Sequence, residues 1–208
     1  MQECKTAHGC LDKGTKFMDN KERILQCALD LFYARGYDAV GVQEIADKAG
    51  ITKPTLYYYF KSKYGLLETL VGTQFERFRK GFCRAAAYNG DVGDTLYRIA
   101  SFFLDFAASH YKFYVLFMAL LYSARENEAY RAVRPYAVEF YREIVGIFDN
   151  ASHELGNMNG RQEQFAIGFL GFINHYVLLA HGGGDASKRV SEEKKKALVK
   201  QFMYGIYS

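Results

Sequence analysis

The most informative stretch of this chain is residues 40–63, which read VGVQEIADKAGITKPTLYYYFKSK. The pattern predicts two short helices joined by a tight turn. Ile45 and Ala46 give the first helix an apolar stripe, and Ala49 continues that stripe one turn later. Gly50 follows, and glycine adopts a positive φ at the end of a helix at little cost. We therefore expect the first helix to end here.

The second helix of this stretch has a clear start. Thr52 is a good N-cap, and Pro54 falls in the opening turn, where its missing N–H costs nothing. The small residues Ala46 and Gly50, with Leu56 beyond them, let the two helices cross closely at a steep angle. This arrangement is a helix-turn-helix, whose second helix enters the major groove of DNA.

The second helix also carries side chains that its own packing does not need. Leu56 and Phe60 are four residues apart and suffice to anchor the helix inward. The side chains left outside are Lys53, Thr55, Tyr57 and Tyr58, with Tyr59 between the two faces. An ordinary helical hairpin with a polar surface is the alternative. It does not explain exposed aromatic residues beside three lysines, for which phosphate is the natural partner.

The chain resembles the tetracycline-repressor (TetR) family of bacterial transcriptional regulators from about residue 18 to residue 78. The resemblance is carried by residues 28–70, ALDLFYARGYDAVGVQEIADKAGITKPTLYYYFKSKYGLLETL. It implies an all-α fold of about nine helices. A three-helix DNA-binding domain with a helix-turn-helix comes first, and a helical domain for ligand binding and dimerisation follows.

The expected organisation has three parts. Residues 1–17 form a flexible arm, residues 18–78 the DNA-binding domain with its helix-turn-helix at about 41–60, and residues 79–208 the effector-binding and dimerisation domain. Helical spacing and caps predict the other helices. The first begins at Asp19, where Glu22 completes a capping box, and ends at Gly36. Further helices are expected at 63–87, 92–109, 113–122, 127–133 (a short piece), from Pro135 to 154, from a cap formed by Asn159 and Gln162 to 182–184, and at 191–204. The basic stretch 188–200 is expected to be a solvated helix face rather than a second DNA site.

Composition supports an all-helical, well-packed chain. Half of the residues are hydrophobic, only two are prolines, and no alternating strand pattern occurs. The net charge is +4, of which residues 1–80 carry +3 (13 basic against 10 acidic) and the other 128 residues carry +1 (14 against 13). A DNA-binding surface must therefore be a local patch. No secretory signal or bilayer-spanning run is present, so a soluble cytoplasmic protein is expected.

Metal, cofactor and enzyme functions find little support. The four cysteines are expected to be free thiols, with Cys27 and Cys83 in the core. Cys4, His8 and Cys10 lack a fourth ligand, so no metal and no cofactor is expected. The chain has no G-x-S-x-G, P-loop or G-x-G-x-x-G motif. His153-Glu154 begins an H-E-x-x-H motif, but Asn157 stands in place of the second histidine.

The resemblance assigns DNA contacts residue by residue. Lys53, Pro54 and Thr55 open the recognition helix, where the family makes base contacts. Tyr57, Lys61 and Lys63 match phosphate-binding positions. Tyr58 and Tyr59 match positions that touch backbone or bases in some members, and Gln43 one that reaches a phosphate or base. The family commonly has Thr or Ser near the start of the first of these helices, whereas Val40, Gly41 and Val42 stand here.

The second domain is expected, from the same resemblance, to hold a homodimer together and to enclose a small-molecule pocket. The candidate interface residues are Gly168, Gly171, Phe172, His175 and Leu179. The candidate pocket residues are Phe102, Phe106, His110, Phe113, Phe117, Tyr122, Tyr136 and Phe140. A fully intramolecular core is the alternative for both sets. The expected function is a ligand-responsive repressor, released from a palindromic operator in double-stranded DNA by an apolar or aromatic effector. An activator of the same fold, a helical enzyme and an adaptor are the alternatives.

Overall fold

The structure is a computed structural model that describes residues 19–153, 155, 158, 160–181 and 189–205. Within these residues the chain forms nine α-helices and no strand, which confirms the predicted all-α class. The helices are α1 (Asn20–Arg35), α2 (Val42–Lys48), α3 (Lys53–Phe60), α4 (Lys63–Ala85), α5 (Val92–Ser109), α6 (Tyr111–Leu121), α7 (Glu128–Asn150), α8 (Gln162–His181) and α9 (Glu192–Tyr204).

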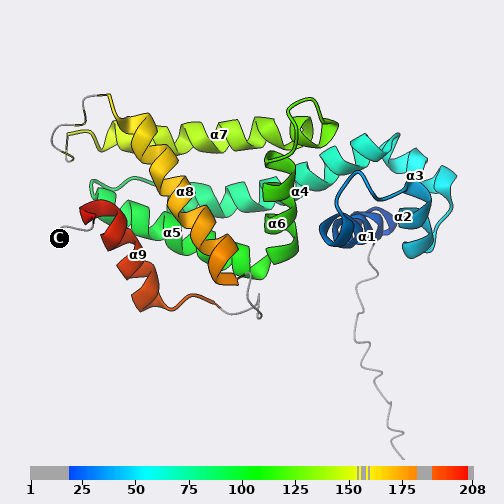
Figure 1. The fold of residues 1–208 in the computed structure, drawn as a ribbon, viewed down its shortest axis with the longest axis horizontal. Helices are drawn as coiled ribbons and strands as arrows, with labels where there is room; N and C mark the ends of the chain where they lie inside the picture. Colours follow the sequence, from blue (N-terminus) through cyan, green and yellow to red (C-terminus); the bar gives the residue numbers. More distant parts are fainter. Residues whose placement is uncertain (1–18, 154, 156–157, 159, 182–188, 206–208) are drawn as a thin grey trace, which may run out of the picture.

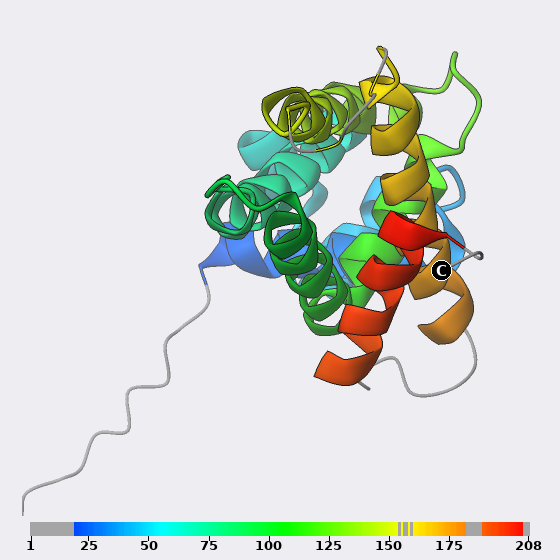
Figure 2. The same ribbon diagram turned by 90° about the vertical axis from the view of Figure 1, so that its left-hand side faces the viewer.

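The molecule is elongated, with a small head at one end and a larger body at the other (Figure 1). Helices α1–α3 form the head, and α4 runs from the head into the body, so the expected domain boundary between residues 78 and 79 falls inside one continuous helix. Helices α5 and α7 pack on α4, and α6 packs on both α1 and α7. Helices α8 and α9 lie on the same side of the body (Figures 1 and 2).

One hydrophobic core joins the head to the body along α4. One face of α4 is buried, from Leu67 and Val71 near the head to Phe78 and Phe82 in the body. The Phe78 ring lies 5.1 Å from the rings of both Phe106 and Phe140, centroid to centroid. Because aromatic rings bury the largest apolar areas, this cluster dominates the packing between α4, α5 and α7.

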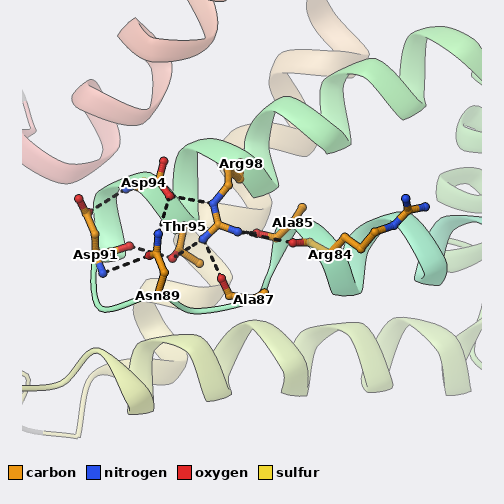
Figure 3. A network of polar contacts seen from close by, with 8 residues as sticks. All are labelled: Arg84, Ala85, Ala87, Asn89, Asp91, Asp94, Thr95 and Arg98. Atoms are coloured by element: carbon orange, nitrogen blue, oxygen red, sulfur yellow. Dashed lines mark hydrogen bonds and ion pairs between the residues drawn. The ribbon is translucent and has the colours of Figure 1, made fainter.

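The corner between α4 and α5 is fixed by Arg98 (Figure 3). Its guanidinium donates hydrogen bonds to the carbonyl oxygens of Ala85 (2.8 Å) and Ala87 (2.7 Å), and its Nε donates to Asp94 Oδ2 (2.8 Å). The last carbonyl groups of a helix have no partner within the helix, and a cation there also interacts favourably with the helix dipole. Arg98 thus ends α4 and sets the direction in which α5 begins.

Helix α7 differs from the prediction of two pieces separated at Pro135. It is a single helix from Glu128 to Asn150 with Pro135 inside it. A proline removes one hydrogen bond and crowds the preceding turn, but it does not end a helix whose neighbouring turns are held by packing. Ala132 and Val133 are buried just before it and Ile144 after it. Helix α7 also ends at Asn150, four residues before the predicted limit.

The remaining helix limits are close to the predictions, with two differences in detail. Helix α5 has the predicted bounds, whereas α6 begins at Tyr111, two residues earlier than expected. Asp19 is the N-cap of α1, but its side chain makes no capping hydrogen bond, so the capping box predicted with Glu22 is wrong. The nearby Asn20 side chain instead accepts a hydrogen bond from Arg23 (2.8 Å).

Lys195 contradicts the expectation that α9 presents only solvated lysines. Its side chain is 2% exposed, and its Nζ donates hydrogen bonds to Asp105 Oδ2 (2.8 Å), Glu192 Oε1 (2.7 Å) and Ser101 Oγ (3.1 Å). Burial lowers the pKa of Lys195, but the hydrogen bonds to Asp105 and Glu192 outweigh burial and raise the pKa above its ordinary value. This buried cation ties α9 to α5.

The two cysteines in the described residues are free thiols, as expected. Their predicted place in the core is wrong for Cys83, which is exposed, and only partly right for Cys27, which is half-buried. Burial raises the pKa of the Cys27 thiol. Cys4, His8 and Cys10, the expected cap at Asn159 and the glycines at 182–184 lie outside the described residues.

None of the helices in the described part of the chain is long and apolar enough to cross a membrane.

Candidate nucleic-acid interface and interior cavity

Helix α3 is anchored by the side chains that the sequence pattern selected. Leu56 and Phe60 are buried, at 0% and 4% exposed. Gly50 has a φ of 62°, and the Thr52 side chain accepts a hydrogen bond from the backbone N–H of Thr55, as an N-cap does. The turn and the cap together leave one face of α3 directed away from the protein.

That outward face combines phenol rings with ammonium groups. Tyr58 is 74% exposed and Tyr57 37% exposed. The Nζ of Lys53 lies 5.8 Å from the Tyr57 ring centroid, and the Nζ of Lys61 lies 5.9 Å from the Tyr58 centroid. At these distances each cation is attracted to the face of its ring, which holds both side chains on the surface. We call Lys53, Tyr57, Tyr58 and Lys61 the α3 cluster.

The other α3 residues selected from the sequence are placed differently. Pro54 is exposed in the first turn, beside the α3 cluster. Thr55 is half-buried, and its Oγ1 shares a 2.8 Å hydrogen bond with Thr52 Oγ1, so only part of its side chain faces outward. Tyr59 is also half-buried, with its ring 5.4 Å from the Tyr58 ring.

Lys63 differs from the exposed lysines of the α3 cluster. Its Nζ lies 4.2 Å from the Tyr37 ring centroid and donates a 3.4 Å hydrogen bond to the carbonyl oxygen of Asp38. Burial lowers the pKa of Lys63, with the charges of Asp38 and Glu128 opposing that effect. The side chain therefore also joins the start of α4 to the turn that follows α1.

The junction between α3 and α4 is tight. Lys61 has a φ of 64°, a left-handed conformation that few residues other than glycine adopt. Ser62 then caps α4 by accepting a hydrogen bond from the N–H of Gly65 (2.9 Å). A Cβ atom at Gly65 would lie 2.2 Å from the carbonyl oxygen of Phe60. The absence of a side chain at Gly65 therefore sets how closely α4 approaches α3.

Gln43 lies on the exposed side of the first turn of α2, and its Nε2 donates a 2.7 Å hydrogen bond to Asp47 Oδ1. Gly41 is the N-cap of α2, in an extended conformation, and glycine is tolerated at that position. An ion pair between Arg35 and Glu44 joins α2 to the end of α1.

The head is also bonded to the start of α7. Tyr37, which is 3% exposed, donates a hydrogen bond from its hydroxyl to Glu128 Oε1 (2.7 Å). Asn127 Nδ2 donates to Asp38 Oδ2 (2.9 Å), while Asn127 Oδ1 accepts from the N–H of Ala129 and so caps α7. These contacts join the turn after α1 to the N-terminus of a helix of the body. Sequence spacing gave no signal for them.

The body encloses a cavity of about 120 Å³ between α4, α5, α6, α7 and α8. Its walls are mostly aromatic. The lining residues are Phe75, Phe78, Phe103, Phe106, Phe113, Tyr114, Phe117, Met118, Leu121, Tyr136, Ala137, Phe140, Leu170 and Asn174.

Five of the eight candidate pocket residues line this cavity, namely Phe106, Phe113, Phe117, Tyr136 and Phe140. Three do not. The Phe102 ring packs against Phe78 and lies over Gly81. The His110 ring stacks on Phe106, with centroids 4.2 Å apart, and borders a separate surface hollow. Tyr122 is 69% exposed. Helical spacing could not distinguish these three from the others, because Phe102 shares a helix with Phe106, while His110 and Tyr122 lie at the two ends of α6.

The cavity has one polar pair that sequence reasoning missed. The Tyr114 hydroxyl donates a 2.6 Å hydrogen bond to Asn174 Oδ1, joining α6 to α8. Tyr114 is 6% exposed, and burial raises its pKa, so its hydroxyl keeps its proton at ordinary pH. Asn174 is a polar residue within the apolar sequence of α8, and this interruption could have indicated a buried polar contact.

Helix α8 turns a mixed apolar and small-residue face away from the body. Gly168 and His175 are exposed, Leu179 is 81% exposed, and Gly171 and Phe172 are half-buried. Ile167, at 60% exposed, extends this face. A Cβ atom at Gly171 would meet nothing within 4 Å. All five candidate interface residues are thus at least partly exposed on α8, and a Cβ atom at Gly168 would lie 3.7 Å from the Phe202 ring of α9.

The fold and the outward face of α3 together define a class, the helix-turn-helix DNA-binding regulators. The family model described as "Bacterial regulatory proteins, tetR family" matches residues 24–70. Residues 24–70 thus match the DNA-binding part of the TetR family, and the curated relatives support placing the chain among the transcriptional regulators of this family.

Two curated relatives show the range of the match. The HTH-type transcriptional activator FasR of Mycolicibacterium smegmatis is 29% identical over 152 residues, which cover 73% of this chain and 68% of FasR. The HTH-type transcriptional repressor KstR of the same species is 38% identical over 72 residues, which cover 35% of each chain. The KstR match therefore spans about a third of that protein's length.

Two solved structures share the whole fold. The fatty acid degradation regulator FadR of Bacillus halodurans superposes with a TM-score of 0.71 at 16% identity, covering 92% of this chain and 98% of FadR. AibR, solved in complex with isovaleryl coenzyme A and operator DNA, superposes with a TM-score of 0.70 at 18% identity, covering 88% and 97%. At these identities the likeness concerns the fold alone.

Proposed function

We propose that this regulator binds a palindromic operator as a homodimer and that a small apolar ligand in the body cavity releases it, so that it acts as a repressor. The α3 cluster is the observation that carries the DNA-binding part. Its aromatic rings and ammonium groups are exposed on a helix whose inner face is already satisfied by Leu56 and Phe60. Duplex DNA offers such a surface both phosphates and base edges.

The contacts divide into base recognition and backbone positioning. Lys53 can donate to guanine O6 and N7, while the ring of Pro54 and the methyl of Thr55 can meet thymine methyl groups. The Tyr57 hydroxyl and the ammonium groups of Lys61 and Lys63 reach phosphates, which position the helix without specifying sequence. Tyr58, Tyr59 and Gln43 complete the surface. Lys63 must exchange its bond to the Asp38 carbonyl for a phosphate.

The proposed dimer uses the outward face of α8. A helix-turn-helix reads few base pairs alone, and two copies on a palindrome add their contacts. Ile167 and Leu179 expose large apolar side chains beside the open Gly171, which is the composition of a helix-packing surface. The mass of the protein at micromolar concentration tests this directly. A monomer would exclude it, and Leu179→Glu should shift a dimer toward monomer.

The proposed effector control rests on the aromatic cavity. FadR is described as a fatty acid degradation regulator, and AibR, which shares the fold, was solved with isovaleryl coenzyme A and operator DNA. Relatives include both the activator FasR and the repressor KstR. We favour repression. An in vitro transcription assay with the operator placed over a promoter distinguishes it from activation.

The first test is selection of binding sites from a random duplex pool at about 0.15 M salt, close to physiological ionic strength. Wild type is compared with Tyr57→Ala, and Tyr33→Ala, an exposed tyrosine of α1, serves as the matched control. Enrichment of a palindrome by wild type and Tyr33→Ala but not by Tyr57→Ala supports the proposal. If wild type enriches no sequence with the cavity empty or filled, the proposed operator binding is wrong.

A further inference from the structure

The cavity in the body carries no formal charge. Its lining residues, as far as the chain is described, include no Asp, Glu, Lys, Arg or His. An ionised group moved from water into such surroundings loses its hydration without gaining a counter-ion, which costs far more than a neutral polar group does. Whatever part of a ligand enters this cavity must therefore be uncharged.

Asn174 supplies the polar group for such a ligand. Its Oδ1 accepts the hydrogen bond from Tyr114, which fixes the amide on the cavity wall. Its Nδ2 carries two N–H groups, and within the described residues neither of them has a protein acceptor at hydrogen-bond distance. A ligand oxygen can fill that role. The Tyr114 hydroxyl oxygen can in addition accept one hydrogen bond from a ligand hydroxyl.

The size of the cavity limits the ligand further. About 120 Å³ is close to the volume of about 150 Å³ that holds one benzene molecule in an engineered apolar cavity. The surrounding phenyl rings offer edges and faces to a flat body of that size. A ligand filling the cavity thus has room for one ring or a short chain and one polar atom.

We propose that the effector, or the part of it that enters the cavity, is a neutral ring or short chain with one hydroxyl or carbonyl oxygen that accepts a hydrogen bond from Asn174. The inference names the ligand class of the cavity used in the proposed function, and so it rests on that proposal. Tyr114 acts as a positioning residue, since it touches Asn174 and holds the amide in one orientation.

Three probes of similar shape test the class, namely phenol, toluene and benzoate. Their binding is measured by titration calorimetry on the intact protein without DNA. Wild type should bind phenol and toluene, and should not bind benzoate. In Asn174→Leu, which keeps the size of the side chain but removes its polar atoms, the ratio of phenol affinity to toluene affinity should fall roughly tenfold, the worth of one hydrogen bond. Tyr114→Phe should also lower the ratio of phenol affinity to toluene affinity, but by a smaller factor than Asn174→Leu.

A second pair of variants checks that binding occurs in this cavity. Ala137→Leu adds volume to its wall and should abolish binding of both phenol and toluene. Ala34→Leu, at an exposed alanine of α1, should leave both affinities within about twofold of wild type, as expected away from packed sites. Thermal unfolding of each variant shows whether it is folded.

Several outcomes overturn the inference. They are binding of benzoate as tight as that of phenol, an unchanged ratio in Asn174→Leu, persistence of binding in Ala137→Leu, or no binding of phenol or toluene to wild type. Failure of the proposed function gives different results. If phenol binds as described but does not alter DNA binding, effector control is wrong and the ligand class stands. If no operator is found but phenol binds as described, the proposed DNA recognition is wrong and the ligand class stands.

Discussion

The Tyr37 hydroxyl donates a 2.7 Å hydrogen bond to Glu128 Oε1 and thereby joins the turn after α1 to the first residue of α7. Helix α7 also lines the cavity, through Tyr136, Ala137 and Phe140. The same helix therefore borders the cavity, the proposed ligand site, at its middle and contacts the head at its start. If a ligand shifted α7, the hydrogen bond between Glu128 and Tyr37 would transmit that displacement to the head.

We expect Tyr37→Phe to weaken that connection. Removing the hydroxyl loses one hydrogen bond beside a buried ring, which should lower the free energy of unfolding by about 1 kcal/mol. The effect of a cavity ligand on DNA affinity should shrink, while affinity without ligand changes little. Denaturant unfolding and DNA titration with and without ligand measure both. Tyr33→Phe, at an exposed site of α1, is the control. An unchanged ligand effect in Tyr37→Phe would exclude this bond as the connection.

The lysines around α3 should separate by salt dependence and by sequence preference. Lys61→Ala and Lys63→Ala should each weaken binding equally on all duplexes and reduce the slope of log K against log salt by about 1, because each removes one phosphate contact. Lys53→Ala should relax base preference at one position instead. Titrations at several salt concentrations, on the operator and on single-base variants, distinguish them. Identical sequence preference in the Lys53 and Lys63 variants would rule out this division.

Lys195→Met should destabilise the body. The ammonium group is buried and donates to Asp105 and Glu192, and the loss of such charged hydrogen bonds costs about 2 kcal/mol. A larger loss is not expected, since Asp105 is 41% exposed and water can replace its lost partner. Denaturant unfolding gives the value. Lys194→Met, on the exposed side of α9, should leave stability unchanged. Equal effects of the two variants would contradict the role of Lys195.

The same contacts predict a pH dependence of stability. Hydrogen bonds from Lys195 and Tyr97 lower the pKa of Glu192 below its ordinary value of 4.5. A carboxyl group with a lowered folded-state pKa contributes stability above its unfolded pKa, and that stability is lost as the pH falls through the folded pKa. Unfolding of wild type and Glu192→Gln, followed from about pH 6 to about pH 3, should converge at the acid end. A constant difference across this range would contradict the assignment.

Two glycine-to-alanine substitutions should change the stability of the protein in opposite directions. Gly65→Ala places a Cβ atom 2.2 Å from the Phe60 carbonyl oxygen, so α3 and α4 must move apart. Such overpacking costs about 1–3 kcal/mol, and DNA binding should weaken as well because α3 is displaced. Gly146→Ala, inside α7 with nothing within 4 Å, should stabilise the protein by about 0.5–1 kcal/mol through its higher helix propensity. Thermal unfolding measures both. A stable, DNA-binding Gly65→Ala variant would contradict the close approach.

Local sequence patterns predicted the head well because its determinants are local. Gly50, Thr52 and Ser62 act within three or four residues of their positions, and Leu56 and Phe60 face inward through helical spacing alone. The predictions for the body agree less well with the structure. Pro135 suggested a break, but packing on both sides of it maintains α7. Rules based on neighbouring residues cannot account for stabilisation by packing against a helix that is distant in the sequence.

The polar contacts between distant helices were the hardest to foresee. Lys195 belongs to a run of lysines, and only the position of α5 distinguishes it from its neighbours. Tyr114 and Asn174 are 60 residues apart and meet only when α6 and α8 are in place. Phe102 and Phe106 share one helix face, yet only Phe106 borders the cavity. Periodicity selects a face, whereas the neighbouring helices decide which of its residues meet empty space.

Helix α4 carries a mechanical consequence. It has 23 residues, so it is a rod of about 34 Å that is packed in the body at one end and attached to α3 at the other. A tilt of about 6° in the body moves the far end of a 34 Å lever by about 3.5 Å, close to the rise of about 3.4 Å per nucleotide along the axis of a duplex. A rearrangement of the body that tilts α4 by this angle about its end in the body would therefore displace α3 by about one base-pair step along the DNA.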